Sequence, residues 1–165
     1  MRPEIYMNTA ILLIGGNLGD REANLAKAVQ LIGKIAEVKK VSALYQTAPW
    51  GSVDQPDYLN QALLISTSLD ALTLLHTLLD IERQIGRIRQ EKWGSRVIDI
   101  DMIFFNSDVI SLPELKIPHP RLHLRNFVLI PLLEIVPDQM HPVFRKTVQE
   151  LADASIDQLP VTKLG

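Results

Sequence analysis

The sequence predicts an α+β fold, in which an antiparallel sheet carries helices on one face. Short apolar or alternating segments are typical of strands, and longer segments with apolar residues three and four apart are typical of helices. These segments follow in the order strand, helix, strand, strand, helix, strand. This is the order of the split βαβ, or ferredoxin-like, plan, here followed by a C-terminal extension. Because many unrelated activities use that plan, it does not by itself indicate a function.

Length and composition indicate one globular domain over residues 1–165, with residues 1–9 as a flexible N-terminal extension. The formal net charge of −2 argues against a general nucleic-acid binder. The sequence has no cysteine, which excludes disulfides and thiolate metal sites, and its apolar runs are too short to span a bilayer. We therefore expect a cytoplasmic monomer that has no nucleic-acid or membrane partner.

The first half of the chain contains three expected strands and one expected helix. Residues 10–15 form a continuously apolar run that ends in glycine, which is typical of a central strand. The glycine-rich turn that follows matches neither common phosphate-loop pattern, so we interpret it as a turn only. Asp20 is placed to cap a helix whose apolar stripe ends at Gly33. Residues 38–47 and the alternating segment from Tyr58 onward are the next two strands.

The second half opens with a helix capped by Asp70, whose apolar stripe ends near Gly86. Residues 97–105 form the fourth strand. The extension is expected to hold short edge pieces at residues 109–112 and 115–117, a partly helical segment at 122–136 and a final helix at 147–154.

The fourth strand carries two aspartates on one face. Alternation places Ile98, Ile100, Met102 and Phe104 on one side, and Asp99, Asp101, Ile103 and Phe105 on the other. The Cβ atoms of the aspartates would then lie roughly 6–7 Å apart. That spacing suits two Mg²⁺ ions about 3.5–4 Å apart, which would share both carboxylates with a substrate phosphate. The structural alternative is that two rim aspartates pair with neighbouring arginines.

A basic segment stands directly before this strand. Its cations surround the sequence Trp93-Gly94-Ser95 and are Arg87, Arg89, Lys92 and Arg96. Metal ions and guanidinium groups both neutralise phosphate oxygens, so an acid pair beside a basic loop is what transfer of a polyphosphate group requires. Isolated arginines usually lie on a solvated face, but four cations around one tryptophan favour a functional site.

Four motifs occur together in this chain. They are Asp-Gln-Pro-Asp-Tyr-Leu-Asn at 54–60, Arg-x-Arg at 87–89, Trp-Gly-x-Arg-x-x-Asp-x-Asp at 93–101 and Pro-His at 118–119. In this combination the chain resembles the 6-hydroxymethyl-7,8-dihydropterin pyrophosphokinases of folate biosynthesis, from about Ala10 to its C-terminal region. The resemblance implies an enzyme that uses ATP and two Mg²⁺ ions. It would transfer the β,γ-diphosphoryl group to the hydroxymethyl oxygen of the pterin and release AMP.

The resemblance also implies roles on the nucleotide side. Asp99 and Asp101 would hold both metal ions, and with Arg87 and Arg96 they would form the catalytic group. The residues that would contact the nucleotide are Glu82, Arg87, Arg89, Trp93, Arg96, Met102, His119 and Arg125. Guanidinium groups keep their charge beside Mg²⁺ and can bind phosphate through two hydrogen bonds.

On the pterin side, the resemblance implies a pocket with flat walls and a polar edge. Its residues would be Thr47, Ala48, Trp50, Tyr58, Asn60, Trp93, Asp99 and Phe127. Tyr58 and Phe127 would stack on the ring, and the Asn60 amide would offer it both a donor and an acceptor. Trp93 would belong to a mobile loop that closes over the site and excludes water.

Some of these residues also have ordinary structural interpretations. Taken alone, Tyr58 and Phe127 are more often packing residues than ligand contacts. His76, His123 and His141 match none of the motifs, so we interpret them as structural or solvated.

The chain also departs from the family pattern at five positions. These are Ala48, Trp50, Leu79, Lys92 and Pro120. They affect adenine-side contacts and loop details, but none removes an expected metal ligand.

Two other functions remain open at this point. A two-metal nucleotidyltransferase would use a similar carboxylate pair but would cleave ATP at the α-phosphorus and release pyrophosphate. A non-catalytic ferredoxin-like module that binds RNA or a small metabolite would not need Asp99 or Asp101, and would present a basic, aromatic sheet face. The exposed face of the sheet is expected to carry acids, which argues against such a module.

Overall fold

A six-stranded antiparallel sheet forms the centre of the molecule. The computed structural model describes residues 6–49, 54–86 and 96–164. The strand order is β5-β1-β4-β3-β8, and β2 also pairs with β4. The strands are β1 (Asn8–Gly16), β2 (Glu37–Val41), β3 (Tyr45–Thr47), β4 (Tyr58–Thr67), β5 (Asp99–Phe105) and β8 (Val161–Lys163). A separate pair consists of β6 (Ile110–Ser111) and β7 (Lys116–Ile117).

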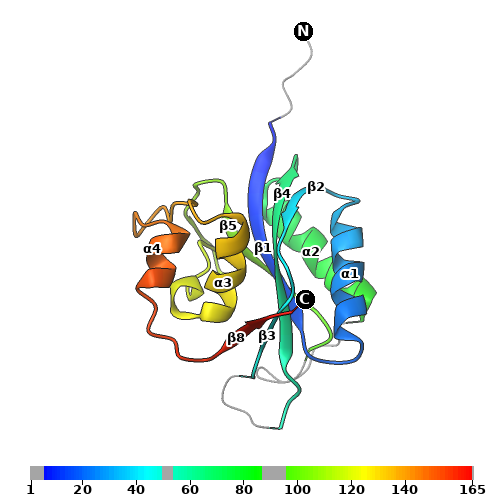
Figure 1. Ribbon diagram of the computed structural model, residues 1–165. Helices are drawn as coiled ribbons and strands as arrows, with labels where there is room; N and C mark the ends of the chain where they lie inside the picture. The colour runs from blue at the N-terminus through cyan, green and yellow to red at the C-terminus, as the bar shows by residue number, and fades with distance from the viewer. Residues whose placement is uncertain (1–5, 50–53, 87–95, 165) are drawn as a thin grey trace.

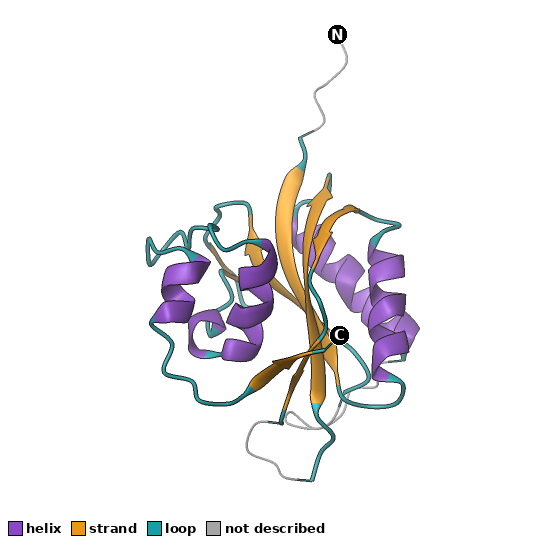
Figure 2. Cartoon of the chain, in the orientation of Figure 1, coloured by secondary structure: helices purple, strands orange, loops and turns teal. Residues whose placement is uncertain are grey.

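Helices cover both faces of this sheet (Figures 1 and 2). α1 (Arg21–Ile32) and α2 (Ala71–Ile85) lie on one face, and α3 (Asn126–Ile135) and α4 (Val148–Asp153) lie on the other. A 3₁₀ turn at Leu122–Leu124 leads into α3. The two helices that were expected on one face are α1 and α2, and they share that face; the helices of the C-terminal extension, α3 and α4, lie on the opposite one.

β1 contributes to a separate core on each face. Ala10, Leu12 and Ile14 pack with residues of α1 and α2, whereas Ile11 and Leu13 pack with residues of α3 and α4. Each of these five side chains is at most 3% exposed. A strand that is buried on both faces needs apolar residues at every position, which explains the unbroken apolar run.

The two helices expected from N-cap aspartates begin where the sequence predicts. The Asp20 carboxylate accepts a hydrogen bond from the backbone N–H of Ala23 at 3.1 Å, and Asp70 accepts one from Thr73 at 2.8 Å. These bonds satisfy N–H groups that have no partner within the helix. Gly86 ends α2 with a φ of 117°, a conformation that favours glycine.

The strand expected at residues 38–47 is divided into β2 and β3. At the break, the Ser42 backbone N–H donates to the carbonyl of Ala62, and the Ser42 hydroxyl oxygen accepts the N–H of Ala62, both at 2.9 Å. The Ala43 N–H then donates to the carboxylate of Glu134 in α3. The hydroxyl oxygen of Ser42 thus takes the place of a backbone carbonyl in the hydrogen bonds to β4. The alternation of apolar and polar residues in the sequence gives no sign of this replacement.

β5 does not alternate along its whole length. Its register with β1 skips Ile103, which is an extra residue in the ladder. Ile103 and Phe104 therefore both pack on the side of α3 and α4, and Phe105 packs on the side of α1 and α2. The predicted faces of Phe104 and Phe105 are wrong for this reason. Asp99 and Asp101 precede the irregularity and keep their shared face.

Both ends of the chain add more to the sheet than the sequence predicts. β1 begins at Asn8, so Asn8 and Thr9 belong to the strand and not to the expected N-terminal extension. β8, which the sequence does not predict, pairs with β3 at the edge opposite β5. The sheet face that was expected to be exposed is partly covered by α3 and α4. Within residues 6–49, 54–86 and 96–164, no helix is long and apolar enough to cross a membrane.

Candidate functional site

Gly15, near the end of β1, lines a cavity on the α3 side of the sheet. It pairs with Asn60 of β4 on one side and with Asp99 of β5 on the other. A side chain at Gly15 would place its Cβ 2.2 Å from Oδ1 of Asn60. The missing side chain therefore leaves space between Asn60 and Asp99, on the face of the sheet that they share.

The cavity has a volume of about 190 Å³. A water molecule takes up about 30 Å³ in the liquid, so this space is large enough for a small organic molecule. The lining residues are Leu13, Gly15, Thr47, Ala48, Pro49, Gln55, Tyr58, Asn60, Arg96, Asp99, Asp101, Arg125 and Phe127. Aromatic, amide, hydroxyl, carboxylate and guanidinium groups thus meet in one place, which is typical of a binding site for a small molecule.

Nine of the residues that the sequence assigns to a site line this cavity. They are Thr47, Ala48, Tyr58, Asn60, Arg96, Asp99, Asp101, Arg125 and Phe127. They come from three strands, from the residue after β3, from the segment before β5 and from the start of α3, so the fold brings distant parts of the sequence together. Trp50, Arg87, Arg89 and Trp93 lie outside the described residues, and so does the loop that was expected to close over the site.

Asp99 and Asp101 form the acidic wall of the cavity on β5. Oδ2 of Asp99 lies 3.1 Å from Nη1 of Arg96, and the Asp99 side chain remains 27% exposed. In the described part of the chain, no group of three or more His, Asp or Glu side chains could hold a metal ion by itself. Two carboxylates still suit Mg²⁺, because this ion usually keeps several waters and takes its other ligands from substrate phosphates.

Thr47 and Asn60 form a buried polar edge. They are 4% and 6% exposed, and the Asn60 amide nitrogen lies 3.5 Å from the Thr47 hydroxyl oxygen. Tyr58 is the ladder partner of Thr47 and also lines the cavity. Burial raises the pKa of the Tyr58 phenol, while nearby Arg96 lowers it and Asp99 raises it. The phenol therefore keeps its proton at neutral pH and can donate a hydrogen bond.

The α3 wall consists of Arg125 and Phe127. The guanidinium carbon of Arg125 lies 5.6 Å from the centre of the Phe127 ring, within the range of a cation–π contact. Burial and the nearby Arg121 lower the pKa of Arg125, while Asp101 and Asp157 raise it. Arginine stays charged at any physiological pH, so the cavity contains a partly buried cation facing its acidic wall.

His119 does not line the cavity, but its charge state is coupled to residues that do. Burial and the charge of Arg125 lower the pKa of His119, while Asp99 raises it. Nδ1 of His119 accepts the backbone N–H of Arg121 at 3.3 Å. A neutral imidazole with an acceptor at Nδ1 carries its proton on Nε2, which leaves that nitrogen as a donor.

Glu82 and Met102 lie on the opposite face of the sheet. Glu82 belongs to α2 and Met102 packs with residues of α1 and α2; they are 2% and 5% exposed. Oε1 of Glu82 accepts the backbone N–H of Ile100 at 2.9 Å. Ile100 stands between Asp99 and Asp101, so Glu82 helps to fix the backbone of β5 from behind the acidic wall.

Asn17 is an important residue that the sequence analysis does not identify. It is 1% exposed; its Oδ1 accepts the backbone N–H of Arg96 at 2.8 Å, and its Nδ2 donates to the carbonyl of Pro56 at 3.0 Å. Gly16 permits this contact, because a Cβ there would lie 2.3 Å from the carbonyl oxygen of Val97. Asn17 thus joins the segments that carry Gln55 and Arg96, both of which line the cavity. The only signal in the sequence is the glycine-rich turn itself.

The three histidines without a motif lie outside the lining of the cavity. His141 is buried and stacks on Phe144 at 4.2 Å, and His123 makes an edge contact with the same ring at 4.8 Å. His76 is largely exposed on α2. These positions agree with their interpretation as structural or solvated residues.

The model of one protein family matches residues 11–137, and its description is 7,8-dihydro-6-hydroxymethylpterin-pyrophosphokinase (HPPK). Three relatives carry the name 2-amino-4-hydroxy-6-hydroxymethyldihydropteridine pyrophosphokinase. The protein from Aquifex aeolicus is 40% identical over 144 residues, which cover 87% of this chain and 90% of that protein. The protein from Bacillus subtilis is 45% identical over 130 residues, 78% of each chain. The protein from Haemophilus influenzae is 35% identical over 158 residues, 93% of this chain and 99% of the relative.

Solved structures of Plasmodium falciparum HPPK-DHPS share the fold. The wild-type structure with pteroate has a TM-score of 0.74 at 18% sequence identity and covers 93% of this chain. The match spans 43% of the Plasmodium chain, which is therefore much longer. The family model and the relatives above show that the chain belongs to the 7,8-dihydro-6-hydroxymethylpterin-pyrophosphokinase family.

Proposed function

We propose that this chain transfers diphosphate from ATP to the hydroxymethyl group of 6-hydroxymethyl-7,8-dihydropterin, giving AMP and the pterin diphosphate in tetrahydrofolate biosynthesis. The names of the relatives support the pterin and the transfer of a pyrophosphoryl group. The observation that carries the proposal is a cavity in which aromatic walls and a buried amide adjoin an acid pair and two arginines.

The ring of the pterin fits the part of the cavity near β3, β4 and α3. Tyr58 and Phe127 offer flat surfaces there, and stacking of aromatic rings contributes about 0.5–1.5 kcal/mol beyond burial. Asn60 and Thr47 provide the polar edge. An amide can accept and donate at once, which suits a ring edge that carries both an amino group and a carbonyl.

The triphosphate of ATP fits the part of the cavity beside β5. Asp99 and Asp101 would hold two Mg²⁺ ions, which when bound neutralise phosphate oxygens and orient the two substrates. Arg96 and Arg125 would add charge-assisted hydrogen bonds to phosphate oxygens. His119, held neutral with Nε2 as a donor, could bind a further oxygen of the nucleotide.

The remaining assignments concern residues outside the described part of the chain and two residues buried behind β5. Arg87 would take part in catalysis with Arg96, Arg89 and Trp93 would contact the nucleotide, and Trp50 and Trp93 would adjoin the pterin. Glu82 and Met102 would act on the nucleotide only through β5, since both are buried behind it.

For the fold, we propose that β5-β1-β4 with β2 and β3 correspond to the ferredoxin-like plan, with α3, α4 and β8 added by the C-terminal extension. The first and third strands of that plan lie side by side in the middle of the sheet, as β1 and β4 do here. The domain would act as a monomer.

The product nucleotide tests the proposed reaction. The protein is incubated with ATP, Mg²⁺ and 6-hydroxymethyl-7,8-dihydropterin, and the adenine nucleotides are separated by ion-exchange chromatography. We expect AMP in equal amount to the pterin diphosphate, and neither product after chelation of Mg²⁺. Pyrophosphate with an adenylated pterin would instead indicate a nucleotidyltransferase, and ADP would indicate transfer of a single phosphate.

A further inference from the structure

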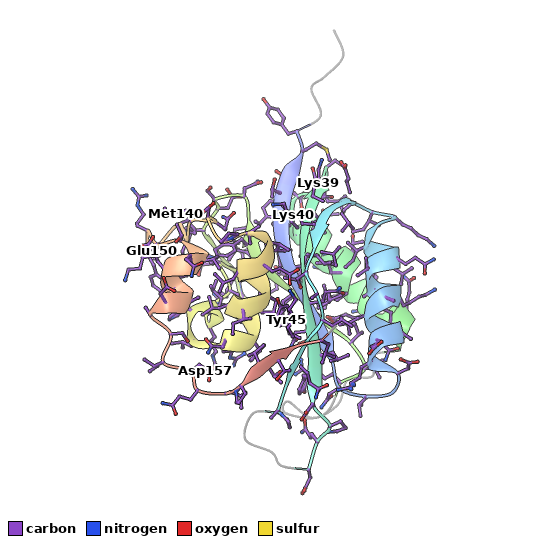
Figure 3. All side chains as sticks on the ribbon, viewed as in Figure 1. Lys39, Lys40, Tyr45, Met140, Glu150 and Asp157 are labelled. Atoms are coloured by element: carbon purple, nitrogen blue, oxygen red, sulfur yellow. The ribbon has the colours of Figure 1, made fainter. Side chains whose placement is uncertain are left out.

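The segment that follows α4 passes the start of α3 and then joins the sheet as β8 (Figure 1). It comprises residues 155–164 and lies beyond the residues 11–137 that the family model matches. Asp157 lies in this segment, between α4 and β8 (Figure 3). The segment therefore contacts two elements that line the cavity, α3 and β3.

Asp157 caps α3 from outside the helix. The N-cap residue of α3 is Arg125, whose side chain makes no capping hydrogen bond. Instead, Oδ2 of Asp157 accepts a hydrogen bond from the backbone N–H of Asn126 at 2.9 Å. The side-chain amide of Asn126 in turn donates to the backbone carbonyl of Asp157 at 2.9 Å. Oδ1 of Asp157 accepts the N–H of Leu159 at 3.0 Å. One carboxylate oxygen thus holds the helix, and the other holds the segment itself.

Further contacts fix this arrangement on both sides. The Ser155 hydroxyl donates to Oδ1 of Asn126 at 2.7 Å and accepts the N–H of Asp157 at 3.3 Å. Downstream, Val161 of β8 pairs with Thr47 of β3. The segment therefore ties the first turn of α3 to the strand that carries the polar edge of the cavity.

The residues on either side of Asn126 in the first turn of α3, Arg125 and Phe127, both line the cavity. We propose that Asp157 is a positioning residue for the pterin. By holding Asn126, it fixes the first turn of α3 and so keeps the Phe127 ring at the place where the pterin stacks. This inference rests on the proposed function, because it assigns the pterin to Phe127.

If Asp157 only stabilised the fold as a helix cap, its loss would have different consequences from the loss of a positioning residue. Loss of such a cap lowers the stability of the protein, but it leaves the affinity of the folded protein for its ligand unchanged. A positioning residue also changes that affinity, and it does so through Phe127. The effect of Asp157 must then depend on the presence of the Phe127 ring, and a double-mutant cycle measures that dependence.

The experiment is calorimetric titration of 6-hydroxymethyl-7,8-dihydropterin into the full chain, with Mg²⁺ and saturating α,β-methylene-ATP. We expect Asp157→Ala to raise the dissociation constant of the pterin about threefold to thirtyfold, the range that corresponds to the loss of a helix cap. Asp157→Asn keeps an acceptor for Asn126 and should raise it less. It also carries the test if Asp157→Ala does not fold. Asp153→Ala is the matched control, because Asp153 is an exposed acid on α4 whose carboxylate accepts a hydrogen bond from Gln149 of its own helix.

In a Phe127→Ala background, we expect Asp157→Ala to change the dissociation constant of the pterin less than about twofold. The inference is overturned if Asp157→Ala and Asp157→Asn bind the pterin as the wild type does, or if their full effect persists without the Phe127 ring. Absence of pterin binding by the wild type would instead overturn the proposed function. Binding and turnover by the wild type, with an unaffected Asp157→Ala, would overturn the positioning role alone.

Discussion

The two faces of the central sheet are closed in different ways. Towards α1 and α2, Ala10, Leu12 and Ile14 of β1 pack in one continuous apolar core with residues of both helices. Towards α3 and α4, Ile11 and Leu13 are buried, but the next residue on that face is Gly15, and the cavity opens there. One strand therefore supplies a complete core on one side and a core that ends in a binding site on the other. Stability and ligand binding should accordingly respond to substitutions on different faces.

The largest expected effect is the loss of activity when a residue on the cavity side of the sheet is substituted. Asp101→Ala should lower turnover by roughly 10³-fold or more, because it removes a proposed ligand of both metal ions and several kcal/mol of transition-state stabilisation. The free energy of unfolding should change little, since a partly exposed carboxylate contributes little to the core. Rates of AMP formation and urea denaturation measure the two quantities. Asp108→Ala, an exposed acid after β5, is the control, and near-normal turnover of Asp101→Ala would remove the metal assignment.

On the face covered by α1 and α2, a substitution should instead lower the stability of the protein. Leu12 is fully buried among residues of α1 and α2, so Leu12→Ala should lower the free energy of unfolding by about 2–5 kcal/mol. The affinity of the folded protein for the pterin should remain close to that of the wild type. Urea denaturation gives the stability, and titration below the unfolding transition gives the affinity. A loss of affinity as large as the loss of stability would mean that the faces are not independent.

A smaller effect should distinguish pterin binding at one end of the cavity from nucleotide binding at the other. Asn60→Ala removes a buried amide from the polar edge, and leaving a partner unsatisfied costs about 1–3 kcal/mol, or roughly fivefold to 150-fold in affinity. The dissociation constant of the pterin should rise by this factor, whereas that of Mg²⁺-ATP should change less than about threefold. Separate titration of the two ligands measures both constants. Equal losses would place the ring elsewhere in the cavity.

The smallest expected effect concerns the apolar part of the α3 and α4 side. His141 is 4% exposed, and burial and the nearby His123 lower its pKa. The unfolded chain therefore binds a proton at His141 more readily than the folded chain does. Neutral His141 makes its full contribution to stability above the unfolded pKa of about 6.5, and this contribution is lost as the pH falls below that value. If the free energy of unfolding is measured at several pH values below about 6.5, it should depend less steeply on pH in His141→Asn than in the wild type. An unchanged slope would show that His141 does not contribute to it.

Patterns with a local physical cause were predictable from the sequence. Asp20 and Asp70 mark the helix starts because a carboxylate in that position satisfies free N–H groups. The acid pair keeps its shared face because strand geometry alone places it. Features that depend on a distant partner were not predictable. The irregularity at Ile103, the break at Ser42 and the strand β8 each depend on a neighbouring strand or on α3.

The same distinction applies to the candidate site. Residue types and strand spacing indicated Asp99 and Asp101, the family resemblance indicated Asn60, and the fold brings these three residues together around Gly15. Asn17 and Asp157 carry no motif, because their role is to join segments that are far apart in the sequence. Residues of that kind are found only when the hydrogen bonds of the folded chain are known.

A crystal structure of the chain with Mn²⁺, α,β-methylene-ATP and 6-hydroxymethyl-7,8-dihydropterin would show whether the cavity holds both substrates and both metal ions. Mn²⁺ replaces Mg²⁺ and gives anomalous scattering, and the methylene group blocks cleavage between the α- and β-phosphorus atoms. We expect two anomalous peaks between the phosphates and the carboxylates of Asp99 and Asp101, with the pterin ring against Phe127 and Tyr58. Metal ions bound elsewhere, or a pterin outside the cavity on the α3 side of the sheet, would contradict this arrangement.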